Sequence, residues 1–245
     1  MIALVTGASS GIGEASAQRL AREPGAKLVL VARREPRLRS LVSQLGAATV
    51  VAADLVEADT PAAVARAVER EHGRLDLLVN NAGAGWAATF AEGGAGNVRR
   101  TMELNFDAVV RLTEALLPIL RRSAPSALVN VSSVAARVAR PGSGAYGASK
   151  AALAAWTDAL ALEEARHGVH VGLVLPGFVA TEGFPQRQLV DRRLTRWMVS
   201  RPERVAEAIV DVGLRRRPER YVPRPYALAA GARLLAPRVL RRLMS

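Results

Sequence analysis

The stretch IALVTGASSGIGEASAQRL, residues 2–20, decides the fold. An apolar run, residues 2–5, leads into a glycine-rich turn, and the segment after the turn has the apolar spacing of a helix. A strand, a glycine turn and a helix in this order begin a nucleotide-binding βα unit, because the first helical turn presents oriented N–H groups to a pyrophosphate. Gly7 permits the tight turn, Gly11 lets a phosphate approach the backbone, and Gly13 allows close packing of helix on strand.

Strands and helices alternate along the rest of the chain. Apolar runs predict strands at residues 27–32, 48–52, 75–79, 127–131, 169–175 and 221–222, and periodic segments predict helices at residues 36–45, 61–71, 98–121, 151–166 and 202–214. This alternation predicts an α/β fold over residues 1–224: a single-domain, Rossmann-type, doubly wound parallel sheet with helices on both faces. Two segments interrupt it, a predicted loop at residues 84–97 and an irregular flap at residues 178–200.

Composition narrows the classes of protein. With 245 residues, 50% of them hydrophobic, the chain can bury the core of one domain. It has no cysteine, and the three histidines lack metal-ligand grouping, so we expect neither a disulfide nor a metal site. An apolar run of about 18 residues and a charged leader are both missing, which favours a cytoplasmic protein.

The net charge of +12 is concentrated at one end of the chain. Residues 185–245 hold fifteen arginines against five acidic residues, which indicates a local surface partner rather than nucleic acid. The tail, residues 225–245, has the spacing of a basic amphipathic segment, interrupted by Pro237. We expect it either to pack on its own domain or a second copy, or to contact an anionic membrane surface.

A second stretch, LVNVSSVAARVARPGSGAYGASK at residues 128–150, carries the chemistry. It predicts a buried strand that leads into Ser133, then a Gly/Pro-rich loop, then a helix with Tyr146 and Lys150 on one face. A nearby ammonium lowers the pKa of a phenol from its ordinary value of about 10, so the pair could act as an acid/base near neutral pH. Ser133 could hydrogen-bond the same substrate oxygen.

The spacing Tyr-x-x-x-Lys is common in helices, and the alternative is that Tyr146 covers the core while Lys150 is solvated. Lysine is rare in this chain, however: of 34 basic residues only Lys27 and Lys150 are lysines. A chain that otherwise uses arginine but keeps a lysine here favours a site that needs a compact, titratable ammonium.

Two further features bear on ligand binding. Arg33 and Arg34 follow the second predicted strand, whose tip meets the adenosine ribose in this fold, and a cation there favours NADP over NAD. The alternative is that both arginines are solvated. Asn105 is isolated among apolar residues of a predicted helix, where it would either cap a local distortion or bind water.

The chain resembles the short-chain dehydrogenase/reductase family through an ordered set of motifs. They are TGASSGIG at residues 6–13, Asp54, NNAG at residues 80–83, Asn105, Ser133, Tyr146 with Lys150, and Pro176-Gly177 with Thr181. Each motif alone is modest, but their order over residues 2–222 is specific.

The resemblance implies a role for each matching position. Tyr146 would be the catalytic acid/base, Ser133 the anchor of the substrate oxygen, and Lys150 the residue that lowers the tyrosine pKa and binds the nicotinamide ribose. Asn105 would distort its helix and hold a water in a proton relay to Lys150. The cofactor would be held by Gly7, Ser9, Ser10, Gly11, Ile12 and Gly13 at the phosphates, Arg33 at the 2′-phosphate, Asp54 at the adenine, Asn81 at the adenosine, and Val179 and Thr181 at the carboxamide. Leu55, Tyr146 and Lys150 would also contact it.

The resemblance also implies a homodimer or homotetramer joined through the helices that start near residues 98 and 147. The chain departs from the family at Ala136, where a glycine is frequent, so the loop after the catalytic serine is expected to be stiffer. The tail after residue 222 is longer than the minimal family core.

We therefore expect reversible hydride transfer between NADP(H) and a carbonyl or secondary alcohol. Apolar side chains favour an apolar substrate, and the candidate walls of its site are Trp86, Phe90, Val134, Phe178, Phe184, Trp197 and Met198. Two alternatives stay open. One is a 3-oxoacyl-carrier-protein reductase whose acidic carrier meets the basic flap, and the other is a non-catalytic NADP-binding sensor or scaffold.

Overall fold

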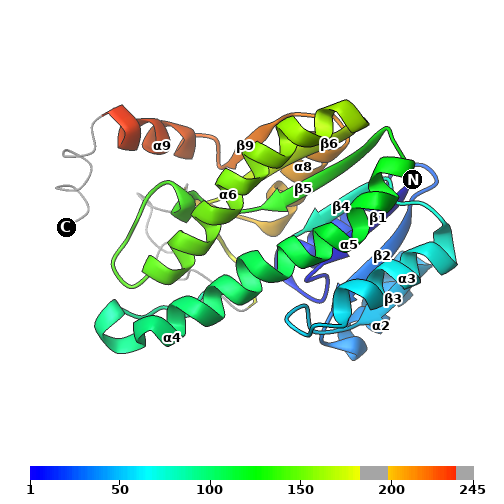
Figure 1. Ribbon diagram of the computed structural model, residues 1–245, viewed down its shortest axis with the longest axis horizontal. Helices are drawn as coiled ribbons and strands as arrows, with labels where there is room; N and C mark the ends of the chain where they lie inside the picture. Colours follow the sequence, from blue (N-terminus) through cyan, green and yellow to red (C-terminus); the bar gives the residue numbers. More distant parts are fainter. Residues whose placement is uncertain (183–197, 236–245) are drawn as a thin grey trace.

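A computed structural model describes residues 1–182 and 198–235 of the chain. A seven-stranded sheet forms its centre, with the strand order β3-β2-β1-β4-β5-β6-β9 (Figure 1). All neighbouring strands of this sheet pair in parallel. The strands are β1 (Ile2–Thr6), β2 (Lys27–Ala32), β3 (Ala48–Ala52), β4 (Leu77–Asn80), β5 (Ser126–Val131), β6 (Val169–Pro176) and β9 (Glu219–Val222). The order reverses between β1 and β4, and at such a switch point the carboxyl ends of the strands form a ligand-binding crevice.

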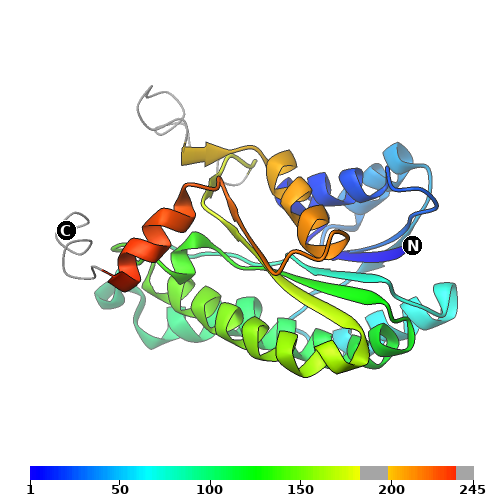
Figure 2. The same cartoon turned by 90° about the horizontal axis from the view of Figure 1, so that it is seen from above.

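Two helical layers cover the sheet (Figure 2). One layer holds α1 (Gly11–Leu20), α2 (Glu35–Leu45) and α8 (Pro202–Gly213), and the other holds α3 (Thr60–His72), α5 (Ala108–Arg122) and α6 (Gly144–Glu164). Each strand supplies both layers, because successive side chains point to opposite faces. In β1, Ala3 and Val5 join the first core, whereas Ile2 and Leu4 join the second. The predicted single-domain, doubly wound α/β fold is confirmed.

The predicted loop at residues 84–97 is wrong in its second half. The helix α4 (Phe90–Met102) begins there, and Thr89 and Glu92 form a capping box at its start. Gly94 has a φ of 53° inside this helix and kinks it. The run of small residues has the composition of a loop. The capping box, however, satisfies the backbone N–H groups of Thr89 and Glu92 and so favours an early start of the helix.

The helix predicted over residues 98–121 is interrupted. A π-helical turn, Glu103–Asp107, lies between α4 and α5, which follow each other along one axis in Figure 1. Asn105 lies inside this turn and is fully buried. The local distortion that the sequence offered as one of two alternatives is therefore present.

The segment predicted as irregular contains short strands at both ends. β7 (Phe178–Val179) and β8 (Val199–Ser200) pair in parallel as a separate two-stranded sheet. The predicted wall residues Phe184 and Trp197 lie outside the described part of the chain.

The start of the predicted tail is packed on the domain. The helix α9 (Tyr226–Leu235) begins with a Tyr226 side chain that is only 9% exposed and lies against Gly177, where a Cβ would be 2.1 Å from the Tyr226 ring. The Tyr226 hydroxyl donates a hydrogen bond to the carbonyl oxygen of Met198. Further along α9, Leu228 and Leu235 are exposed. The other tail residues predicted to be amphipathic, 236–245, lie outside the described residues.

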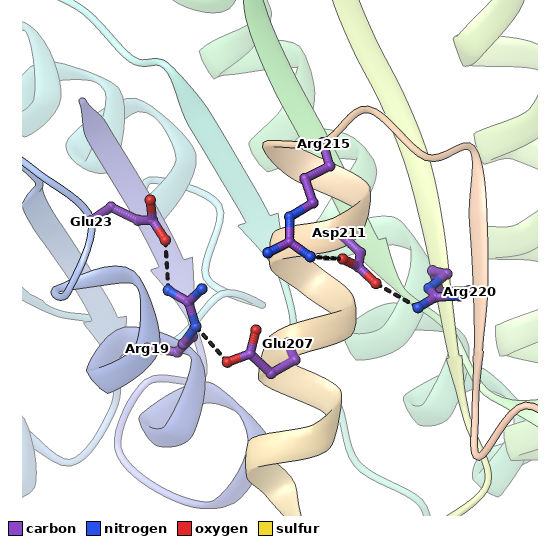
Figure 3. Close-up of polar contacts among 6 residues, drawn as sticks. All are labelled: Arg19, Glu23, Glu207, Asp211, Arg215 and Arg220. Carbon is purple, nitrogen blue, oxygen red and sulfur yellow. Dashed lines mark hydrogen bonds and ion pairs between the residues drawn. The ribbon is translucent and has the colours of Figure 1, made fainter.

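Ion pairs join α1, α8 and β9 on one side of the sheet (Figure 3). Arg19 of α1 pairs with Glu23 and with Glu207 of α8. Asp211, only 8% exposed, accepts hydrogen bonds from Arg215 and from Arg220 of β9. These pairs fix α8 against the sheet, next to the strand that leads into α9.

Candidate active site

The glycine-rich turn forms a tight cradle at the carboxyl end of β1. Gly7 and Gly11 have positive φ values, 66° and 57°, which favour glycine. A Cβ on Gly13 would lie 2.2 Å from the carbonyl oxygen of Gly7, so only glycine allows α1 to approach the strand this closely. A Cβ on Gly11 would lie 3.0 Å from the Thr181 methyl carbon, which places the segment after β7 beside the turn.

Asn81 ties the end of β4 to this turn. Its side-chain amide donates to the carbonyl oxygen of Thr6 at 2.9 Å, and its backbone N–H donates to the Thr6 hydroxyl at 2.9 Å. The Asn81 amide nitrogen would be 2.7 Å from a Cβ on Gly13. These contacts fix the spacing between the two strands that border the switch point. Side chains at these glycines would fill the cradle. The open cradle fits the phosphates of a dinucleotide.

The two arginines after β2 have different partners. Arg34 reaches over the glycine-rich turn, where its guanidinium donates to the hydroxyls of Ser9 at 3.1 Å and Ser10 at 2.6 Å. Arg33 is largely exposed and lies 3.5 Å from a carboxylate oxygen of Asp54. The sequence interpretation assigned the 2′-phosphate to Arg33, but Arg34 is the arginine in contact with the turn.

The remaining predicted cofactor positions border the same edge of the sheet. Asp54 also accepts a hydrogen bond from the backbone N–H of Val56. Leu55 and Val179 are buried in the core, with 6% and 8% of their surfaces exposed. Ile12, at the start of α1, packs partly buried against that core.

The predicted catalytic residues come together at the carboxyl end of β5. Ser133 lies two residues after the end of β5. Its hydroxyl donates to the carbonyl oxygen of Pro176 at 3.3 Å and accepts from the N–H of Ala135 at 3.1 Å. Lys150 is 3% exposed, and its Nζ donates to the carbonyl oxygen of Val131 at 2.9 Å. Tyr146 is half-buried one helical turn before Lys150, whose Nζ lies 5.9 Å from the centroid of the tyrosine ring.

The pKa values of this pair differ from the sequence expectation. Loss of hydration raises the pKa of Tyr146 above its ordinary value, while hydrogen bonding with Ser133 and the charge of Arg140 act to lower it. Burial lowers the pKa of Lys150 to about 8. The sequence predicts a lowered pKa for Tyr146 beside the Lys150 ammonium, whereas burial raises this pKa and the ammonium donates to a backbone carbonyl.

Asn105 faces Lys150 across a glycine. Its side-chain amide donates to the carbonyl oxygen of Ala84 at 2.8 Å and to the Ser149 hydroxyl at 3.0 Å, and its Oδ1 accepts from the N–H of Ala84. A Cβ on Gly83 would lie 2.8 Å from Asn105 Oδ1 and 3.2 Å from Lys150 Nζ. Glycine at position 83 therefore keeps the space between these two polar groups open.

The described wall residues are unevenly buried. Val134 is buried, Phe178 and Met198 are half-buried, Trp86 is 37% exposed and Phe90 is 76% exposed. The guanidinium carbons of Arg100 and Arg140 lie over the rings of Trp86 and Phe178, each at 4.7 Å. Ala136, the departure from the family pattern, packs against a small apolar cluster that includes Leu173 and Leu175.

Sequence reasoning missed some contacts around the site. Glu182, next to Thr181, forms a bidentate ion pair with Arg37 of α2, with both N–O distances at 2.8 Å. A Cβ on Gly85 would be 3.1 Å from the Tyr146 ring. A long-range pair such as Arg37 and Glu182, 145 residues apart, leaves no periodic signal in the sequence, and a glycine in a polar loop reads only as a turn residue.

Other sites are weaker candidates. A hollow of about 650 Å³ lies between α3 and α5 and contains none of the residues above. Within residues 1–182 and 198–235, no group of three or more histidine or acidic side chains is placed to hold a metal ion. In the same part of the chain, the helices are all too short or too polar to cross a membrane.

A doubly wound parallel sheet with a glycine-rich turn at its switch point places the chain in the class of Rossmann-type α/β proteins. Residues 1–189 match the model of the short chain dehydrogenase family, and the chain belongs to that family of oxidoreductases. Members bind a nicotinamide cofactor.

Individual relatives agree with this assignment. The oxidoreductase UcpA of Salmonella typhimurium is 40% identical over 185 residues, which cover 73% of this chain and 69% of that protein. The Pseudomonas aeruginosa RhlG/NADP active-site complex superposes with a TM-score of 0.78 at 32% identity, over 86% of this chain and 88% of that one. L-Sorbose reductase from Gluconobacter frateurii, solved with NADPH and L-sorbose, gives a TM-score of 0.77 at 31% identity, over 86% and 88% of the two chains.

Proposed function

We propose that the chain is an NADP(H)-dependent oxidoreductase that interconverts a carbonyl and a secondary alcohol on an apolar substrate. The observation that carries the proposal is the convergence of Ser133, Tyr146 and Lys150 at the carboxyl end of β5, with Asn105 in a π-helical turn behind Lys150. A binding module needs none of these polar groups at one strand end, and keeping a lysine 3% exposed is costly without a use for its charge.

Each side chain has a defined task in the proposed reduction. Tyr146 donates its proton to the substrate oxygen as that oxygen gains negative charge, and Ser133 hydrogen-bonds the same oxygen. Lys150 stabilises the phenolate that remains. Asn105 lines the polar space beside Lys150, through which a new proton reaches Tyr146. A nicotinamide cofactor held beside these side chains would supply the hydride in this direction and accept it in the other.

The preference for NADP rests on the arginines after β2. Arg34 is held over the glycine-rich turn by Ser9 and Ser10, and Arg33 lies beside it. A guanidinium presents several N–H donors to a phosphate, so this arrangement favours a 2′-phosphate over a free ribose hydroxyl. The two solved relatives named above are complexes with NADP or NADPH, which agrees with this preference.

The Tyr146→Phe variant tests the proposed chemistry. We expect it to lower the oxidation of NADPH by a panel of apolar ketones by at least about 100-fold, because the proton donor is lost, and to leave NADPH binding within about twofold. The matched control is Tyr221→Phe, which removes a half-buried phenol oxygen from β9, outside the proposed site. Unchanged turnover in the Tyr146 variant would contradict the mechanism. Binding of NADPH without turnover of any ketone by the wild-type chain would favour the sensor or scaffold instead.

Two proposals concern partners. Homodimer or homotetramer formation would join α5 and α6 of neighbouring copies, and Leu162 on α6 is 83% exposed. Contact with an anionic membrane would use the exposed Leu228 and Leu235 of α9, together with the arginines of the tail. The double variant Leu228→Ser/Leu235→Ser tests this contact without removing Tyr226, and unchanged sedimentation with phosphatidylglycerol vesicles would count against it.

A further inference from the structure

Arg140 is a cation without an acidic partner among the described residues. It is exposed in the loop between Ser133 and Tyr146. Arg137, three residues earlier, differs in this respect, because its guanidinium lies 3.8 Å from carboxylate oxygens of Asp158 and Glu219. Within this loop, Arg137 has acidic side chains nearby, whereas the charge of Arg140 is not offset by one among the described residues.

The position of Arg140 is fixed relative to the proposed catalytic residues. Its guanidinium carbon lies 4.7 Å from the centroid of Phe178, the first residue of β7. Two residues before Phe178, the carbonyl oxygen of Pro176 accepts the hydrogen bond from Ser133. The charge of Arg140 also acts on Tyr146, where it opposes the rise in pKa that burial causes. Arg140 therefore stands at the side of the site that Ser133 and Tyr146 border.

The loop that carries Arg140 also contacts the segment around Trp86, another of the predicted wall residues. The carbonyl oxygen of Gly142 accepts a hydrogen bond from the N–H of Ala88 at 3.0 Å, which ties the loop to the segment that holds Trp86. The hydroxyl and the backbone N–H of Ser143 both donate to the carbonyl oxygen of Arg140. The backbone at Arg140 is thus tied to the segment that holds Trp86, and the Arg140 side chain stacks on Phe178.

Stacking on an aromatic face leaves the N–H groups at the edge of a guanidinium available for a planar anion. The planar guanidinium of Arg140 matches a carboxylate, which has one charge and two coplanar oxygens. We propose that Arg140 determines specificity by binding a carboxylate carried by the apolar substrate at a distance from its reacting carbonyl. This inference rests on the proposed oxidoreductase function and narrows its substrate class to apolar oxo-acids and hydroxy-acids.

A pair of substrates that differ only in charge tests the inference. Medium-chain oxo-acids and their methyl esters present the same ketone, with and without a carboxylate, and NADPH oxidation is measured for each. We expect the wild-type chain to prefer the acid at least about tenfold in kcat/KM. The free energy of a charge-assisted hydrogen bond corresponds to a factor of about this size. Arg140→Met should remove the preference, mainly by raising KM for the acid, and should lower kcat/KM for the ester much less than for the acid.

The matched control is Arg137→Met, which removes the same charge and a similar volume from the same loop. We expect it to leave the ratio between acid and ester unchanged, because its guanidinium already has Asp158 and Glu219 beside it. Equal use of acid and ester by the wild-type chain, or an equal loss on both substrates in Arg140→Met, would overturn the inference while the proposed function stands. If the wild-type chain oxidised NADPH with none of these ketones or those of the wider panel, the proposed function and the inference would both fail.

Discussion

Lys150 Nζ lies 5.9 Å from the centroid of the Tyr146 ring and donates its hydrogen bond to the carbonyl oxygen of Val131. The ammonium therefore lies beside the phenol ring, while its hydrogen bond goes to a backbone carbonyl. Both side chains lose hydration there, which disfavours the charged form of each. The acid/base properties of the pair thus depend on burial as much as on the attraction between their charges.

We predict that carbonyl reduction loses efficiency above pH about 8. Burial lowers the pKa of Lys150 to about 8, so the ammonium is charged below this pH and loses its charge above it. The pKa of Tyr146 is raised, so the phenol keeps its proton across this range and does not limit reduction. The measurement is kcat/KM for a ketone from pH 5.5 to 10. A constant value up to pH 10 would rule out a role for the Lys150 charge.

The Lys150→Arg variant is the control for this profile. A guanidinium stays protonated throughout the same range, so the variant should lack the alkaline decrease whatever its absolute rate. A decrease near pH 8 that persists in Lys150→Arg would assign it to another group.

A Gly83→Ala substitution should reduce turnover strongly. The new Cβ would lie 2.8 Å from Asn105 Oδ1 and 3.2 Å from Lys150 Nζ, so at least one of these groups would have to move. Because small displacements of catalytic groups cost large factors in rate, we expect kcat to fall at least about tenfold. Thermal unfolding and ketone-dependent NADPH oxidation are measured together, so that a loss of rate is separated from a loss of fold.

Gly96→Ala provides the matched control for this substitution. Gly96 is exposed in α4 and has no atom within 4 Å of an added Cβ. Alanine is the better helix former, so we expect unchanged turnover and a gain in stability of about 0.5–1 kcal/mol. A Gly83→Ala variant that was as active as Gly96→Ala would show that the space between Asn105 and Lys150 is not needed.

The sequence predicted the sheet and its helices well because both depend on local patterns. Apolar runs in β1 and β2 and the glycines of the first turn are read directly from neighbouring residues. The loop before α4 was mispredicted because Gly93 and Gly94 suggest a turn, whereas Thr89 and Glu92 cap a helix there. The glycines and the capping residues therefore favour different structures for the same segment, and the structure adopts the helix that the capping box favours.

Within the site, the sequence identified the right stretches but not every contact. The spacing of Tyr146 and Lys150 and the place of Ser133 at the end of a predicted strand identify these residues, and the structure brings them to one strand end. The choice between Arg33 and Arg34 could not be made from sequence, because adjacent residues differ only in the direction of their side chains. That direction is set by the hydroxyls of Ser9 and Ser10, which lie 24 or 25 residues earlier.

Replacing Arg34 should change the choice of cofactor. We expect Arg34→Leu to raise KM for NADPH at least about tenfold and to leave KM for NADH within about twofold, because only NADPH carries the 2′-phosphate that the guanidinium would bind. Arg33→Leu should have a smaller effect, since Asp54 lies 3.5 Å from the Arg33 guanidinium and offsets part of its charge. The control is Arg39→Leu, whose side chain is exposed and paired with Glu35. An equal loss with both cofactors would point to a structural role of Arg34.

Asp211 should stabilise the fold through Arg215 and Arg220 (Figure 3). Desolvation opposes its charge, but the two arginines prevail and hold its pKa below the ordinary value. A depressed carboxylate pKa contributes stability above the unfolded-state pKa and loses it as pH falls through the folded-state pKa. We therefore expect Asp211→Asn to lose about 1–3 kcal/mol of unfolding free energy at pH 7, and the difference from wild type to shrink below pH about 4.

Asp158→Asn is the control, because Asp158 is 66% exposed and should change stability by less than about 0.5 kcal/mol. Denaturant unfolding at both pH values decides the matter, and equal stability of Asp211→Asn and Asp158→Asn at pH 7 would show that the ion pairs of α8 contribute nothing measurable.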